Sequence, residues 1–364
     1  MSRAHNFCAG PCTLPESVIA ELADELPDYR ETGTSVIEMS HRSPDYEAIH
    51  LEALDLLRSL YSVPDDFDVL LVQGGATLQF AMVPMNLLAA GENAGYVMSG
   101  AWARKALDDA AKVGNAYTAW AADVSTDAGT MTRMPSPDEV MIQPGSRYLH
   151  ITSNETIEGV RFTNFDGFDA RLVADMSSDY LSRPIDWDLF DLVYGGAQKN
   201  LGPAGLAVVF VRSSIVEQTP EQLPAYLRYD THAKSKSLAN TPSVFAIWAM
   251  GKVLRWMADN GGVAAMEKRA AMRSAMVYDL IDGSGDFYRN PVEPRFRSHM
   301  NVVFRLPTEE LEKRFLAEAA SERLLNLPGH RSVGGVRASI YNGLPTESVE
   351  TLTSFMSDFA AKAR

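Results

Sequence analysis

The sequence has few cysteines and no long apolar run. Only Cys8 and Cys12 occur in 364 residues, which excludes a disulfide framework. With His5 they offer at most three metal ligands on one short segment, so we expect no metal site. No stretch reaches the roughly 20 apolar residues of a membrane-spanning helix, and residues 1–11 lack the apolar core of a secretory signal. We therefore expect a cytoplasmic protein.

Positive charge is also scarce. Lys and Arg number 33 against 47 Asp and Glu, which gives a formal net charge of −14. Such a charge repels nucleic acid and anionic membranes, so neither is an expected partner. The 46% hydrophobic and 22% charged content is that of a globular protein. An anionic substrate would require Arg and His to cluster against the overall sign of charge.

The chain is long for one compact core, so we expect two domains with a shared cleft. Its first part alternates aliphatic runs, small-residue loops and helical patterns, which is typical of a largely parallel sheet covered by helices on both faces. Such sheets bind ligands at the carboxyl ends of their strands. Strands are expected at 69–72, 96–98, 148–151, 172–174, 192–194 and 206–211.

Helix signals complete this pattern. Ser43 and Pro44 are typical of a helix start, so His41 and Arg42 lie in the loop before it. Gly74-Gly75 connects a strand to a helix expected at 78–88. Two further helices, at about 244–257 and 263–280, precede a change of composition at 283–294. A strand at 301–306, a helix at 309–321, a strand at 336–340 and a helix from about 346 predict a smaller α+β domain.

One lysine stands where a strand is expected to end. Lys199 follows Gly195-Gly196-Ala197-Gln198, between two aliphatic runs. A loop lysine is usually solvated. Among small residues at the mouth of a sheet, however, its amine can be partly desolvated and neutral often enough to form an imine with a carbonyl group. Aldehyde cofactors use that chemistry.

Three other features fit an aldehyde cofactor with a pyridine ring. Asp175 ends an expected strand, where it either caps a turn or pairs with a cation such as a protonated ring nitrogen. Together with Lys199 it points to pyridoxal phosphate. Gly75-Ala76-Thr77 is either a plain turn or a phosphate site at a helix N-terminus. Trp102 follows a strand and either stacks on the ring or belongs to the core.

Arginines and histidines in loops are the candidates for binding anions. A guanidinium group grips a carboxylate or a phosphate through two hydrogen bonds. Each arginine alone is as well explained by a surface ion pair. Together they predict a substrate with two anionic groups, bound by His41, Arg42, His330, Arg331 and Arg337.

These motifs resemble those of the phosphoserine aminotransferases, which are class V pyridoxal-phosphate-dependent aminotransferases. The resemblance runs nearly end to end, through residues 6–11, 39–43, 73–75, 154–159, 174–178, 196–205, 240–242 and 329–335. It implies the α/β, aspartate-aminotransferase-like fold (fold type I), with a mostly parallel seven-stranded sheet in a large domain and a smaller α+β C-terminal domain. We expect an N-terminal segment (1–15) that packs with the small domain, a large cofactor-binding domain (16–264) and a small domain (265–364).

The resemblance implies transfer of an amino group between L-glutamate and 3-phosphohydroxypyruvate, giving O-phospho-L-serine and 2-oxoglutarate in serine biosynthesis. It leaves open a second use on the phosphohydroxythreonine step of pyridoxine biosynthesis. Lys199 is implied to be the Schiff-base lysine and proton shuttle, Asp175 the partner of the pyridine nitrogen, Trp102 the stacking ring and Thr156 the partner of the phenolic oxygen. The cofactor phosphate is implied to contact Gly75, Ala76, Thr77 and Gln198.

In this family Asn240 and Thr241 reach the cofactor phosphate of the neighbouring subunit, which implies a homodimer with shared active sites. Arg337 is implied to bind the α-carboxylate of the substrate. The resemblance also implies a clamp that binds the substrate phosphate or the side-chain carboxylate of glutamate. This clamp is assembled across the dimer interface from His41, Arg42, His330 and Arg331.

The sequence departs from the family pattern at two places, and three alternative functions make other demands on the sequence. Ala76-Thr77 stands where some members carry Gly-Arg, and Ala9 stands where others carry serine. An alanine–glyoxylate aminotransferase would not need two His-Arg pairs. A cysteine desulfurase needs a distal cysteine, whereas both cysteines here precede residue 13. A cofactor-binding regulator without catalysis would show an added DNA-binding segment or a broken lysine motif.

Overall fold

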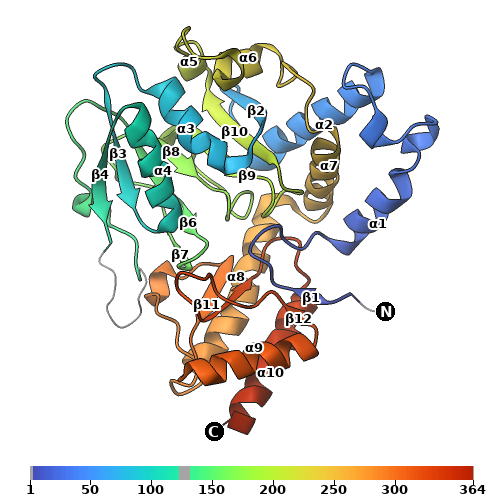
Figure 1. The fold of residues 1–364 in the computed structure, drawn as a ribbon, viewed down its shortest axis with the longest axis vertical. Helices are drawn as coiled ribbons and strands as arrows, with labels where there is room; N and C mark the ends of the chain where they lie inside the picture. The colour runs from blue at the N-terminus through green and yellow to red at the C-terminus, as the bar shows by residue number, and fades with distance from the viewer. Residues whose placement is uncertain (1–2, 123–131, 364) are drawn as a thin grey trace.

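The protein is described from a computed structural model, which places residues 3–122 and 132–363. A large part is built around one sheet, and a smaller part at the other end holds both the first strand and the last helix (Figure 1). Within the described ranges, no helix combines the length and the apolar character that crossing a bilayer requires.

The central sheet has seven strands in the order β2-β10-β9-β8-β5-β3-β4. Neighbouring strands are parallel except at β10, which runs antiparallel to both β2 and β9. The mostly parallel seven-stranded sheet is therefore confirmed. Its strands are β2 (Phe67–Gln73), β3 (Asn93–Met98), β4 (Asn115–Ala121), β5 (Ser146–Thr152), β8 (Leu172–Asp175), β9 (Phe190–Gly196) and β10 (Leu206–Arg212).

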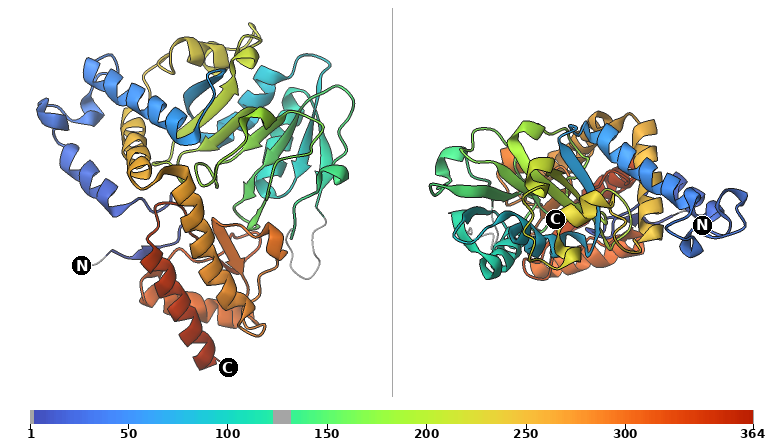
Figure 2. Two further views of the ribbon diagram at one scale, coloured as in Figure 1. Left: turned by 180° about the vertical axis from the view of Figure 1, so that it is seen from behind. Right: turned by 90° about the horizontal axis from the view of Figure 1, so that it is seen from above.

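Both faces of this sheet are apolar, because alternate residues of the buried strands enter different cores. Val208 and Phe210 belong to one core, whereas Val209 and Val211 belong to the other. The first core lies under α2 (Pro44–Tyr61) and α7 (Val244–Asp259), and the second under α3 (Gly75–Leu87) and α4 (Ala101–Val113). Figure 2 shows the two helix layers from behind and from above.

The start of α2 follows the sequence prediction. Ser43 accepts a hydrogen bond from the backbone N–H of Tyr46, and Pro44 occupies the first helical position. The large part also contains α1 (Glu16–Glu25), α5 (Ser213–Val216), α6 (Tyr229–Lys234) and the hairpin of β6 (Asn154–Glu155) and β7 (Val160–Arg161). Short 3-10 helices lie at η1 (Tyr29–Glu31), η2 (Val36–Glu38), η3 (Pro137–Glu139), η4 (Trp187–Leu189), η5 (Ala225–Leu227) and η6 (Pro294–Phe296).

The smaller part has its own core. Phe7 packs there with residues from 277 to 359, and β1 (His5–Asn6) pairs parallel with β12 (Leu324–Leu325). Strand β11 (Asn301–Phe304) pairs antiparallel with β13 (Val336–Ser339). Helices α9 (Glu309–Ser321) and α10 (Thr346–Ala363) complete it. Helix α8 (Gly262–Asp282) crosses the expected limit at 264/265, and the domain limits stay a prediction.

Candidate active site

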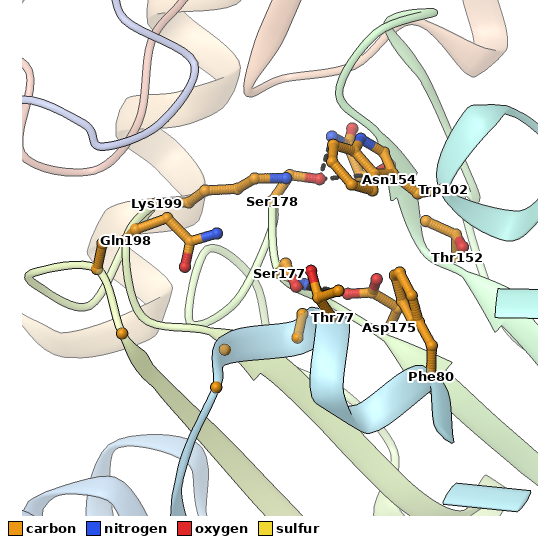
Figure 3. A pocket seen from close by; sticks show the side chains of 15 residues that line it. Thr77, Phe80, Trp102, Thr152, Asn154, Asp175, Ser177, Ser178, Gln198 and Lys199 are labelled. Carbon is orange, nitrogen blue, oxygen red and sulfur yellow. Dashed lines mark hydrogen bonds between the residues drawn. The ribbon is translucent and has the colours of Figure 1, made fainter. Parts of the chain in front are cut away.

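A cavity of about 360 Å³ opens at the carboxyl end of the central sheet. It is bordered by the ends of β5, β8 and β9 and by the N-terminal turns of α3 and α4. Parallel sheets gather ligand-binding groups at this edge. Figure 3 shows Lys199 and Gln198 on one side of the cavity, Trp102 and Asn154 across from them, and Asp175 near Thr77 and Phe80.

Lys199 lies just beyond β9 and is only 7% exposed. Its Nζ donates a hydrogen bond to Thr156 Oγ1 at 2.5 Å. Burial lowers the pKa of Lys199 to about 8, although the carboxyl groups of Asp175 and Glu155 act in the opposite direction. Since an exposed lysine titrates near pH 10.4, a far larger fraction of this amine is neutral at physiological pH, as imine formation requires.

Asp175 ends β8 and is 4% exposed. Its Oδ1 accepts hydrogen bonds from Ser177 N at 2.9 Å and from Ser177 Oγ at 2.6 Å. Burial raises the pKa of Asp175, against the effect of Ser177 and the charge of Lys199. Among the described residues no basic group lies within 4.0 Å of this carboxylate. It is therefore ready for a cation that enters from the cavity.

The loop between β2 and α3 suits a phosphate group. Gly74 and Gly75 have φ angles of 95° and 61°, in the left-handed region that favours glycine. No side chain caps α3, so the N–H groups of Gly75, Ala76 and Thr77 face the cavity rim without an intrahelical partner. The helix dipole also favours an anion there. Gln198 lines the cavity near this loop.

Trp102 enters the cavity from the first turn of α4. Lys199 Nζ lies 5.6 Å from the centroid of its ring. Trp102 Nε1 and Thr152 Oγ1 are both buried, and neither has a hydrogen-bond partner in the described part of the chain. Buried polar groups are rarely left unsatisfied. The cavity therefore fits pyridoxal phosphate, because it offers a buried amine, a buried acid, an aromatic wall and the uncapped N-terminus of a helix.

Arg337 borders the same region from β13. Its Nη1 donates to the carbonyl oxygen of Thr156 at 3.3 Å, while its Nε is buried and has no partner within the described residues. Burial lowers the pKa of Arg337. His330 Nδ1 is hydrogen-bonded to Ser332 Oγ at 2.6 Å. Burial lowers the pKa of His330, and the charges of Arg337 and Arg331 act in the same direction.

This cavity is not lined by Thr156, His330, Arg331 or Arg337, although Thr156 contacts Lys199. Four further predicted site residues do not line it either. His41 is half-buried and Arg42 exposed in the loop before α2. Asn240 and Thr241 are exposed, and both contact Gln73, which precedes the phosphate loop. A role in a neighbouring subunit's site stays a prediction for all four.

The sequence interpretation missed some residues of the site. Ser177 holds Asp175, and its position two residues after the acid was the available signal. Glu155 and Glu158 lie in the quoted segment 154–159 without an assigned role, since only the structure reveals that both are buried. Over residues 3–122 and 132–363, no cluster of three or more His, Cys, Asp or Glu is arranged to hold a metal ion.

Comparison with known proteins identifies the family. The family model of class-V aminotransferases matches residues 4–352. A phosphoserine aminotransferase of Geobacillus kaustophilus is 50% identical over 359 residues, which are 99% of each chain.

Two solved structures agree with this match. The phosphoserine aminotransferase of Bacillus circulans subsp. alkalophilus superimposes with a TM-score of 0.95 at 47% identity, covering 100% of this chain and 99% of that one. The phosphoserine aminotransferase of Trichomonas vaginalis with bound pyridoxal phosphate gives a TM-score of 0.91 at 34% identity, covering 98% of this chain and all of that one. The chain therefore belongs to the class-V aminotransferases, the pyridoxal-phosphate-dependent family of fold type I in which these relatives are found.

Proposed function

We propose that this chain is a phosphoserine aminotransferase, which transfers an amino group between L-glutamate and 3-phosphohydroxypyruvate and so forms O-phospho-L-serine and 2-oxoglutarate. One observation carries the proposal: the buried amine of Lys199 shares a cavity with Asp175, Trp102 and an uncapped helix N-terminus. The full-length similarity to phosphoserine aminotransferases supports the choice of substrates.

Pyridoxal phosphate, when bound, supplies an aldehyde that condenses with amines and a ring that accepts the electron pair of a broken Cα–H bond. With the cofactor bound, Lys199 would hold its aldehyde group and would be displaced by the substrate amine. Its neutral amine would then remove the proton from the substrate Cα and would return a proton at the end of the transfer. Thr156 orients the lysine amine through the 2.5 Å hydrogen bond. Asp175 would hold the ring nitrogen and would favour its protonated form.

Arg337 is proposed to bind the α-carboxylate, because its guanidinium is half-buried, incompletely hydrogen-bonded and close to Thr156. A second anionic group is proposed to meet His330 and Arg331 of the same chain. The clamp is completed by His41 and Arg42 from the other subunit of a homodimer. Arg42 is exposed, His41 is half-buried, and neither residue lines this chain's own cavity, which supports that arrangement.

The same homodimer would use Asn240 and Thr241. These two residues are proposed to reach the partner's cofactor phosphate. Their hydrogen bonds with Gln73, which directly precedes Gly74-Gly75, support the proposal. We also propose that the enzyme acts in the cytoplasm, in serine biosynthesis, and accepts the phosphorylated keto acid of the pyridoxine pathway.

The test is an assay of the purified holoenzyme with glutamate and a panel of keto acids. We expect visible absorption from the bound cofactor, and faster amino transfer to 3-phosphohydroxypyruvate than to pyruvate or glyoxylate. Faster transfer from alanine to glyoxylate would instead identify an alanine–glyoxylate aminotransferase. A protein that takes up no pyridoxal phosphate would overturn the proposal.

A further inference from the structure

The first turn of α4 is held by carboxyl groups from another element. No side chain of the helix or its flanks caps it, so its first N–H groups need other partners. Ala101 N donates to Glu158 Oε1 at 3.0 Å, Trp102 N to Glu155 Oε2 at 3.2 Å and Ala103 N to Glu155 Oε1 at 3.1 Å. Both acids come from the β6–β7 hairpin and the turn within it.

Glu155 makes more of these contacts than Glu158 does. Its side chain is fully buried, and Ser99 Oγ also donates to Oε1 at 3.2 Å. A Cβ atom added to Gly100 would lie 2.4 Å from Glu155 Cδ. The carboxyl group thus occupies the space that any side chain at position 100 would need. This packing leaves the first turn of α4 little freedom to move against the hairpin.

A buried acid is an expensive cap. The structure caps α2 with Ser43 and α9 with Thr308, two residues that need little desolvation. Burial, together with the neighbouring charge of Glu158, raises the pKa of Glu155 well above its usual range. The helix dipole offsets part of this cost. Capping alone therefore does not account for the choice of residue.

The position of the hairpin supplies a reason. Thr156 follows Glu155 directly and accepts the hydrogen bond from Lys199. Thr156 thus contacts the amine of Lys199. Its neighbour Glu155 holds the backbone of Trp102, whose ring forms the aromatic wall of the cavity. This single short element thus contacts both Lys199 and the backbone of Trp102, whose ring centroid lies 5.6 Å from Lys199 Nζ.

We propose that Glu155 is a positioning residue that fixes the first turn of α4, so that the Trp102 ring lies against the cofactor ring at a set distance from Lys199. Glu155 does not line the cavity itself, and it acts through Trp102. The inference rests on the proposed function, because it requires a cofactor with an aromatic ring in this cavity.

A double-mutant cycle tests the proposal. Apoprotein with Glu155→Ala, Trp102→Ala or both changes is titrated with pyridoxal phosphate. Each single change is expected to raise the dissociation constant about tenfold, the value of one stacked aromatic pair. Both changes together should raise it no further than Trp102→Ala alone, because Glu155 acts through that ring. An unchanged dissociation constant in Glu155→Ala, or a hundredfold rise in the double variant, would overturn the role.

Two further variants separate positioning from plain destabilisation. Glu312 is a buried acid that accepts from Leu306 N and pairs with Arg305 in the smaller part, so Glu312→Ala should lower the unfolding midpoint without changing the dissociation constant. An equal loss of cofactor affinity in that variant would contradict the proposal. If Glu155→Ala does not fold, the cycle is run with Glu155→Gln, which keeps the shape and one acceptor oxygen.

The induced circular dichroism of the cofactor gives a second readout. It depends on the aromatic wall and should weaken in Glu155→Gln but not in Glu312→Ala. The experiment also separates a failure of the proposed function from a failure of the role of Glu155. A wild-type protein that does not bind pyridoxal phosphate refutes the proposed function, whereas tight wild-type binding with an additive cycle refutes only the role of Glu155.

Discussion

At the scale of single residues, the proposed chemistry depends on one amine whose surroundings keep it from water. Lys199 is buried, donates to Thr156 and faces Asp175 across the cavity. Lys105 provides a natural contrast, because its Nζ lies 4.3 Å from the same Trp102 ring while its side chain is exposed. The two lysines thus share an aromatic neighbour and differ in burial.

This contrast gives a matched pair of variants. Lys199→Ala should lower turnover at least about a thousandfold, because both the covalent link and the proton transfer are lost. Lys105→Ala should keep turnover within about threefold, as expected for a surface change. Steady-state assays and the visible spectrum of each variant measure the difference. Comparable losses in both variants would show that burial does not select the reactive lysine.

The lowered pKa of Lys199 predicts a pH profile for cofactor uptake. Only the neutral amine condenses with an aldehyde, so the rate at which apoprotein takes up pyridoxal phosphate should rise with pH and level off above about 8. Stopped-flow absorbance across pH 6 to about 10.5 measures the profile. A rate that still climbs at the top of this range would mean that the amine titrates like an exposed lysine.

At the scale of elements, helix ends decide where functional groups point. The uncapped start of α3 faces the cavity, while α9 begins at Thr308, whose Oγ1 accepts from Leu311 N at 3.2 Å. The N-terminus of α3 thus leaves its N–H groups available to a ligand, whereas the N-terminus of α9 is capped by its own side chain.

The cap of α9 should therefore contribute to stability and not to activity. Thr308→Ala is expected to lower the free energy of unfolding by about 1 kcal/mol and to leave turnover unchanged. Thr353→Ala is the control, because this hydroxyl donates within α10 to Glu350 O and caps nothing, so the change should be neutral or slightly stabilising. Urea unfolding followed by circular dichroism compares them. Equal midpoints for both variants would contradict the capping role.

At the scale of the whole molecule, the predicted site residues of one chain do not all gather at one place. Lys199 lines the cavity and Arg337 contacts Thr156 beside it, whereas neither His41 nor Arg42 lines it. In the proposed homodimer each site takes its lysine from one subunit and Arg42 from the other.

Subunit mixing tests this arrangement. Lys199→Ala and Arg42→Ala should each be impaired, whereas unfolding and refolding an equal mixture should restore about a quarter of wild-type activity. Half of the dimers are then hybrids, and each hybrid holds one intact site. Mixing Lys199→Ala with Asp175→Asn is the control, because both residues belong to the same chain's site and no hybrid restores it. A mixture with Arg42→Ala that regains no activity would exclude the shared site.

The sequence by itself determined the local features. Local features depend on neighbours within a few residues, so the sequence alone reveals them. Examples are the start of α2 at Ser43-Pro44, the aliphatic strands and the Gly-Ala-Gln-Lys segment. The α/β class and the amine with its acid could therefore be predicted, as could the likeness to a family.

Only the tertiary structure decided which distant groups meet. Strand β10 runs antiparallel to both of its neighbours, although its aliphatic pattern is the same as that of the parallel strands. Strand β4, at the sheet edge, was not predicted. Lys199 and Thr156 are 43 residues apart, and Glu155 caps a helix that begins 54 residues before it. Burial and strand direction arise from packing between segments, and packing is a property of the whole fold that no local pattern carries.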